Sequence, residues 1–226
     1  MIKLMQDGKF KWSPILALGS LWGLSEAAGG MFLRGVCARF ISGSVLTGMA
    51  IFFMATAFFY SRKKSNLLVL LLFAIGFKLL DALLLKLPVL HGAIGNPIFG
   101  FYTEAFAFIA MLWILKPDFT EKPFGAAVLG AITALVAVNL FPLVRFFTGI
   151  PACVVPGTQY PLSLYYAPIA IGFSAFSSFL GMTLGKRMSR VTDPALARIP
   201  DSRLAPIFIR AIPLFCLALI LLIRLA

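Results

Sequence analysis

Four charged side chains fall inside stretches of the sequence that are otherwise apolar. Lys78 and Asp81 lie in the run NLLVLLLFAIGFKLLDALLLKL, Glu26 lies in SPILALGSLWGLSEAAGGMFL, and Glu104 lies in NPIFGFYTEAFAFIAMLWIL. Charges in lipid are costly, so such groups usually line a protected cavity, where they are paired or functional. Carboxylates and an ammonium group could bind a polar ligand or a cation, or take up a proton. The pattern predicts a polar site within a membrane rather than a simple anchor.

Lys78 and Asp81 are three residues apart, so in a helix they share one face and are able to pair. One interpretation is that they only neutralise each other. Glu26 and Glu104 have no opposite charge within four residues in the sequence. Each must find a partner on another helix, bind a cation, or be protonated, because burial disfavours the charged form. The sequence leaves these three possibilities open.

The composition indicates what must position these groups. The chain is 61% hydrophobic and 12% charged, with a mean hydropathy of +0.98. Repeated apolar stretches of about 20 residues are long enough to cross a hydrocarbon layer of roughly 30 Å, and they predict an all-α, polytopic membrane protein. No loop is long enough to fold separately, so residues 1–226 are expected to form a single membrane domain.

Seven apolar segments can be placed, separated by proline- and glycine-containing breaks. They predict one bundle of six to seven transmembrane helices. The predicted spans are residues 13–33, 40–61, 66–87, 97–115, 123–147, 163–185 and 205–223.

The net charge of +12 invites a nucleic-acid interpretation, but its distribution argues against one. With the N-terminus inside, most lysines and arginines fall on the inner side, as the positive-inside rule requires. We therefore expect a multi-pass protein of the bacterial inner (cytoplasmic) membrane, with anionic lipids at its inner face and no nucleic-acid partner. The C-terminus lies outside if the seventh segment spans.

The topology allows the depths of the polar groups to be compared. Counted from the inner edge at about 1.5 Å per residue, Lys78 lies roughly 18 Å up, Glu26 and Glu104 roughly 20 Å, Asp81 roughly 22 Å and Asn139 roughly 24 Å. Unrelated polar residues would be scattered over many depths. A shared polar chamber in the outer half of the bilayer is the simplest explanation.

The predicted outer loops add further ligand-binding candidates. The third loop holds His91 and Asn96, and the fifth holds Tyr160. For any single tyrosine, an ordinary interfacial anchor is the alternative interpretation. Because His91 is the only histidine and zinc-type spacing is absent, no metal site and no cofactor are expected.

Two cysteines fall on the outer side of this topology. Cys37 and Cys153 could form a disulfide, since that side is oxidising, and two free thiols are the alternative. Cys216 lies within the last segment and is expected to pack there.

Small residues line one side of the first segment. Gly19, Gly23 and Ala27 form a ladder with four-residue spacing, and Ala17 and Ser20 extend it. Such a ladder permits the close approach of another helix. That helix belongs either to this chain or to a separate membrane subunit docked at Ala17, Gly19 and Gly23.

Sequence signatures of enzymes are lacking. There is no GxSxG, no HExxH and no glycine-rich phosphate loop. A binding role is therefore favoured over an enzymatic one. Active transport would have to take its energy from a partner or from an ion gradient.

The chain resembles the substrate-binding S components of energy-coupling factor vitamin transporters and related bacterial membrane families. The likeness rests on size, the inside N-terminus, the small-residue ladder and the strings LWGLSEAAGG and NPIFGFYTEAFAF. It covers six of the seven segments, since S components usually have six. The resemblance implies a small-molecule site beneath the outer loops and docking to a coupling subunit driven by ATPases. The predicted substrate-binding residues are Glu26, Lys78, Asp81, His91, Asn96, Glu104, Asn139 and Tyr160.

Two other classes of function remain open. One is an intramembrane enzyme acting on a lipid, with Glu26, Glu104 or His91 as acid or base. The other is a non-catalytic subunit of a larger membrane complex, in which the buried charges only pair with partner helices. A basic outer rim, made of Arg34, Arg39 and Arg145, would favour an anionic group on a ligand, whereas the carboxylates below it would favour a cationic or hydrogen-bond-donating end.

Overall fold

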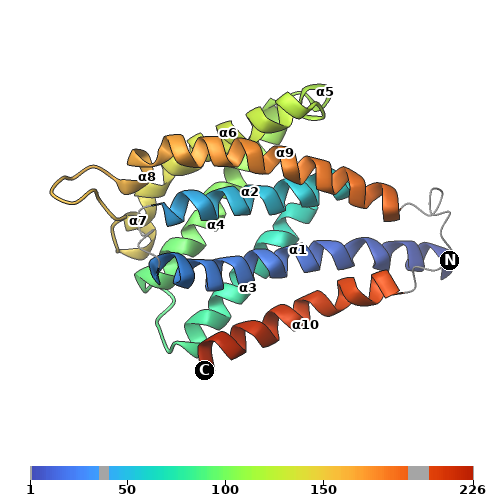
Figure 1. Cartoon of the computed structure of the whole chain (residues 1–226), viewed down its shortest axis with the longest axis horizontal. Helices are drawn as coiled ribbons and strands as arrows, with labels where there is room; N and C mark the ends of the chain where they lie inside the picture. Colours follow the sequence, from blue (N-terminus) through green and yellow to red (C-terminus); the bar gives the residue numbers. More distant parts are fainter. Residues whose placement is uncertain (1, 36–40, 193–203, 226) are drawn as a thin grey trace.

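The described part of the chain is almost entirely helical (Figure 1). The computed structural model describes the backbone of residues 2–35, 41–192 and 204–225. Within these ranges the only strand-like pairing is one isolated bridge between Val154 and Pro161. The all-α prediction is thus confirmed for this part of the chain. The long helices are α1 (Ile2–Gly35), α2 (Ser42–Ser61), α3 (Ser65–Leu84), α4 (Gly92–Ile114), α6 (Pro123–Leu140), α9 (Ala167–Thr192) and α10 (Leu204–Leu225).

Short elements join the long helices. They are α5 (Pro117–Thr120), the 3-10 turn η1 (Phe141–Leu143), α7 (Val144–Thr148) and α8 (Leu162–Tyr165). The predicted span 123–147 is therefore divided near its end. Pro142 accounts for the division, because proline has no backbone N–H and disfavours a regular helix interior.

Within the described residues, five helical segments are long and apolar enough to cross a membrane, which indicates a multi-pass membrane protein. They match the second to sixth predicted spans, although their ends differ by a few residues. The helices α1 and α10 occupy the first and seventh predicted spans but are not among these five. The five segments are Ser42–Ser61, Ser65–Leu84, Gly92–Ile114, Pro123–Thr148 and Ala167–Arg190.

The most extensive helix contact lies between α2 and α9. A Cβ atom added to Gly181 would lie 2.6 Å from the carbonyl oxygen of Phe52, and one added to Gly185 would lie 2.5 Å from that of Thr56. Only glycine allows the two backbones to come so close. This Gly-x-x-x-Gly pair joins α9 to the bundle, and α9 in turn packs along α6.

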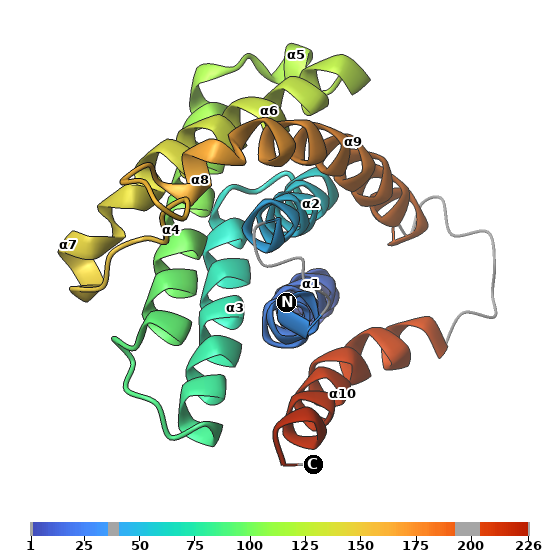
Figure 2. The same ribbon diagram turned by 60° about the vertical axis from the view of Figure 1, so that its left-hand side comes forward.

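Helix α1 lies inside the bundle, where Figure 2 shows it end-on among α2, α3 and α10. Its small-residue ladder faces α3. A Cβ on Gly19 would lie 2.8 Å from the Cβ of Phe73, and one on Gly23 would overlap the side chain of Phe77. The contact left open by the sequence is therefore made within the chain. The face predicted to dock a partner subunit at Ala17, Gly19 and Gly23 is covered, at the two glycines, by α3 of the same chain, and the docking itself stays a prediction.

One end of the bundle brings together the parts that form the site. Figure 1 shows the end of α1, the beginnings of α2, α4 and α9, and the short helices α7 and α8 gathered there. Further into the bundle, the buried Trp22 of α1 packs against Phe101 of α4, with ring centroids 5.2 Å apart. Glu26 follows Trp22 by one helical turn, and Glu104 follows Phe101 by almost one. This aromatic contact therefore sets how α1 and α4 present their two carboxylates.

Candidate functional site

A cavity of about 300 Å³ opens at this end of the bundle. The beginnings of α2, α4 and α9, the end of α6, the middle of α1 and the loop around α8 all contribute to it. Its volume is at the small end of the range for ligand pockets. The side chains and backbone that line it include Glu26, Ser42, Ser44, Leu46, Thr47, Asn96, Phe101, Thr103, Glu104, Ala137, Val138, Phe141, Cys153, Leu162, Ser163, Tyr166 and Ala170.

Glu26 and Glu104 meet in this cavity. Only 8% of Glu26 and 6% of Glu104 is exposed, and the two carboxyl groups are close enough to repel each other when both are charged. The Thr47 hydroxyl lies near enough to Glu104 to act as a hydrogen-bond donor to it. The Oε2 atom of Glu104, however, has no hydrogen-bond partner among the described residues. A buried carboxylate oxygen in a cavity, without a donor, is a strong acceptor for a bound group.

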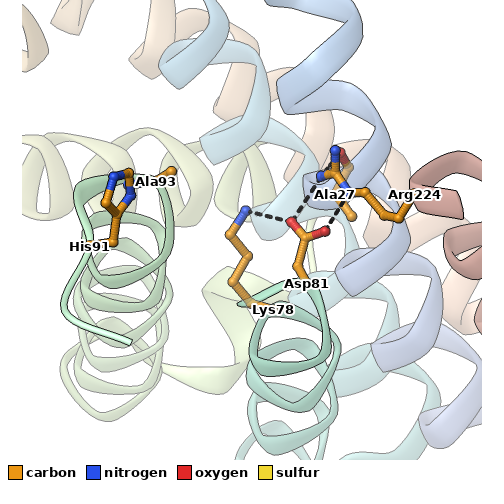
Figure 3. A network of polar contacts seen from close by, with 6 residues as sticks. All are labelled: Ala27, Lys78, Asp81, His91, Ala93 and Arg224. Carbon is orange, nitrogen blue, oxygen red and sulfur yellow. Dashed lines mark hydrogen bonds and ion pairs between the residues drawn. The ribbon is translucent and has the colours of Figure 1, made fainter. Parts of the chain in front are cut away.

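A third buried carboxylate, that of Asp81, does not line the cavity and has a full set of partners (Figure 3). Asp81 Oδ1 accepts a hydrogen bond from Arg224 Nε at 2.6 Å, and Oδ2 accepts from Arg224 Nη2 at 2.9 Å and from Lys78 Nζ at 3.2 Å. The same Arg224 Nη2 donates to the carbonyl oxygen of Ala27 at 3.2 Å. These bonds join α10 to α3 and α1. We call Lys78, Asp81 and Arg224 the ion-pair latch.

The latch and the glutamate pair belong to one run of charges. Lys78 lies close enough to Glu26 for a favourable electrostatic interaction. Lys78 and Asp81 are buried, yet neither lines the cavity. The order from the cavity outward is Glu104, Glu26, Lys78, Asp81 and Arg224.

The arrangement can bind, and it can exchange a proton. Two neighbouring carboxyls resist being charged together, so a cation or a shared proton would relieve their repulsion. The chemistry that the cavity supports most directly is recognition of a bound molecule.

Three predicted site residues lie elsewhere. His91 is exposed and begins α4, where its Nδ1 accepts a hydrogen bond from the backbone N–H of Ala93 at 3.2 Å; Figure 3 draws it well apart from the latch. Tyr160 is 51% exposed on the loop before α8. Asn139 is exposed, and its amide donates to the carbonyl oxygen of Leu135 at 2.7 Å, one helical turn back. None of the three lines the cavity.

Asn96 does line the cavity. Its Oδ1 accepts a hydrogen bond from the Thr148 hydroxyl at 3.2 Å, which ties the beginning of α4 to the end of α7. Asn96 therefore helps to hold this wall of the cavity in place. The bond uses the amide oxygen of Asn96 and not its amide nitrogen.

Several residues of the cavity and of the ion-pair latch were not predicted from the sequence. Arg224 was not among the predicted site residues, although it is the main partner of Asp81. The cavity is also lined by three hydroxyl residues, Ser42, Ser44 and Thr47. Their clustering at the start of a predicted span was a pattern from which the sequence could have predicted a polar lining there. The aromatic walls Phe141 and Tyr166 carried no such signal, because aromatic residues are frequent throughout these helices.

The predictions about a metal site and a disulfide can be compared with the structure only in part, because some of the residues concerned lie outside the described ranges. Among the residues whose side chains the structure describes (13–29, 41–190 and 209–224), no group of three or more His, Cys, Asp or Glu side chains could hold a metal ion. Cys153 is a free, exposed thiol at the cavity, and Cys37, its predicted disulfide partner, lies outside the described residues. Cys216 is free and buried in α10.

Comparisons of the chain with known protein families, with curated proteins and with solved structures find no match. The function must therefore be argued from the cavity and its charges.

Proposed function

We propose that the protein is the membrane-embedded substrate-binding subunit of a small-molecule uptake transporter in the bacterial cytoplasmic membrane. Its N-terminus is inside, and α1 and α10 cross the membrane together with the five apolar segments. The observation that carries the proposal is the cavity at one end of the bundle, in which two buried carboxyls meet and one oxygen has no donor among the described residues. Such an arrangement is costly in a membrane protein unless something binds there.

The distribution of charge supports an outward-facing cavity. At the opposite end of the bundle Arg62 pairs with Glu121 at 2.8 Å, and Lys186 donates to the Glu121 carbonyl oxygen. At the same end, the Nζ atom of Lys64 lies 3.7 Å from the centroid of the Trp113 ring. Lysine, arginine and tryptophan at one end of a bundle are typical of the inner membrane interface. The cavity, at the other end, would then open outward.

The cavity size supports a small ligand. A volume of about 300 Å³ suits a molecule of modest size rather than a lipid with long chains. The lining combines two carboxyls with aromatic and aliphatic walls, as in sites that enclose a small amphiphilic molecule.

A partner ATPase module is the proposed source of energy. The chain has no nucleotide-binding motif, and the partner comes from its resemblance to S components. Because Gly19 and Gly23 face α3, a coupling subunit would have to contact another surface.

Purification under native conditions tests the proposal. We expect a small molecule to remain bound to the protein extracted in mild detergent, identified by mass spectrometry after denaturation. We also expect an ATPase module to co-purify from the native host. Glu26→Gln should lower the amount of retained molecule, whereas the control Glu121→Gln, in the exposed ion pair at the far end, should not. A protein that retains no small molecule and associates with no ATPase would overturn the proposal.

A further inference from the structure

The ionisable groups among the described residues of the cavity lining include carboxyl groups and no basic group. Among its described residues are two carboxyls, Glu26 and Glu104, and no lysine, arginine or histidine. Arg145, one of the predicted basic rim residues, is exposed and stacks on Phe146, with its guanidinium carbon 4.6 Å from the ring centroid. The side chains of Arg34 and Arg39 lie outside the described residues. The described cavity is thus acidic.

We propose that the cavity binds a small organic cation, whose charged head lies between Glu26 and Glu104 and whose apolar part contacts the aromatic walls. This inference rests on the proposed function and specifies the class of its ligand.

The charge balance supports a positive ligand. With both glutamates ionised, Glu26, Glu104 and Asp81 carry three negative charges against the two positive charges of Lys78 and Arg224. One negative charge is then left for a bound cation or a shared proton to balance. Lys78 does not remove the excess, because its Nζ is bonded to Asp81. A single positive charge between the two glutamates would balance the whole run, and burial makes that balance energetically important.

Hydrogen bonding supports a ligand that donates. Glu104 Oε2 accepts no bond from any described residue. Three hydroxyls of the lining already donate to backbone carbonyls: Ser44 to Tyr166, Thr103 to Gly100 and Ser163 to Val138. The Thr47 hydroxyl is the one that lies near Glu104. The lining therefore offers mostly acceptors, and a protonated amine, which has only donors to offer, complements it.

The rest of the lining favours an organic cation over a metal ion. Calcium and magnesium need about six to eight oxygen ligands, whereas much of this lining is Leu46, Phe101, Val138 and Phe141. Aromatic rings attract organic cations through their faces as well as through apolar contact. A cavity with a carboxylate pair and aromatic walls suits a charged head on an apolar body.

Binding of defined probes to the purified full chain in neutral phosphatidylcholine nanodiscs tests this. The probes are choline, benzylammonium and benzamidinium. Choline is compared with its neutral analogue 3,3-dimethylbutan-1-ol, benzylammonium with benzyl alcohol and benzamidinium with benzamide. Sodium and calcium chloride serve as the inorganic arm. We expect at least one organic cation to bind at least tenfold more tightly than its neutral analogue, as measured by calorimetry.

Variants assign that preference to the glutamate pair. Glu104→Gln should remove most of the difference between cation and neutral analogue, and Glu121→Gln should keep it. Glu26→Gln provides the same test if Glu104→Gln folds poorly, and the comparison on the unmodified protein requires no variant at all.

Several outcomes would overturn the inference. They are equal binding of cations and neutral analogues, binding of sodium or calcium alone, and no binding of any organic cation in the panel. A retained native molecule that is anionic or neutral would also overturn it, while leaving the proposed uptake function in place. Absence of any retained molecule and of any ATPase would remove both.

Discussion

The ion-pair latch and the glutamate pair both contain buried carboxyl groups, but the partners of these groups differ. Asp81 is 1% exposed and receives three hydrogen bonds from two cations. Glu104 is 6% exposed, lies near a second carboxyl, and keeps an oxygen without a described partner. A satisfied buried charge joins helices, whereas an unsatisfied one beside a cavity is available to a ligand. The comparison separates a structural group from a binding group by its partners.

Asp81→Asn should give the largest effect. The change leaves the buried Lys78 and the largely covered Arg224 without their carboxylate, and breaking a buried pair typically costs about 3–5 kcal/mol. We expect a large drop in the thermal unfolding midpoint in detergent. Faster proteolysis near α10 should accompany it, because Arg224 joins that helix to α3 and α1.

The exposed ion pair between Arg62 and Glu121 provides the matched control. Its side chains are 43% and 50% exposed, so Glu121→Gln should change stability by no more than about 1 kcal/mol. If Asp81→Asn were as mild as this control, the latch would not hold α10.

Glu104→Gln should separate binding from stability. It makes the same chemical change as Asp81→Asn, but it removes a repulsive charge rather than a paired one. We expect unchanged or raised thermal stability. Ligand affinity should fall by roughly ten- to hundredfold, because a hydrogen bond to a charged group contributes about 1.5–3 kcal/mol. A fall in stability comparable to that of Asp81→Asn would show that Glu104 is structural as well.

Gly23→Ala tests whether the packing of α1 on α3 holds the glutamate pair and the ion-pair latch in their relative positions. Its Cβ would overlap Phe77 of α3, and overpacking typically costs about 1–3 kcal/mol. Because α1 carries Glu26 and α3 carries Lys78 and Asp81, stability and ligand retention should fall together. Gly76→Ala is the control, since a Cβ there meets nothing within 4 Å. Lost ATPase association with unchanged stability would instead point to a partner at this face.

His91→Ala should have the smallest effect. The side chain caps α4 through the backbone N–H of Ala93 and is exposed, so we expect a loss of no more than about 1 kcal/mol in stability. Ligand retention should be unchanged, because His91 does not line the cavity. His91→Asn, which can also cap, should restore the stability. Reduced retention in both variants would extend the site to this loop.

Hydropathy and local spacing alone were enough for the class and for one ion pair. Long apolar runs predicted an all-helical, multi-pass protein, and five of the seven predicted spans meet the criterion for crossing a membrane. Lys78 and Asp81 pair at 3.2 Å, as their three-residue spacing predicted. Both results depend on properties within about one helical segment, which is why sequence determines them.

Sequence spacing also yields depth along a helix, but it yields neither the rotation of that helix nor its neighbours. Asn139 was predicted at the depth of the glutamates, yet its side chain is exposed and bonds to its own helix. The Gly19–Gly23 ladder predicted a close helix contact without saying whose helix makes it, and only packing assigned it to α3. Arg224 reaches Asp81 across 143 positions of sequence. Which charges meet, and which carboxylate is left for a ligand, was decided by tertiary structure, because contacts between helices depend on their rotation and packing order.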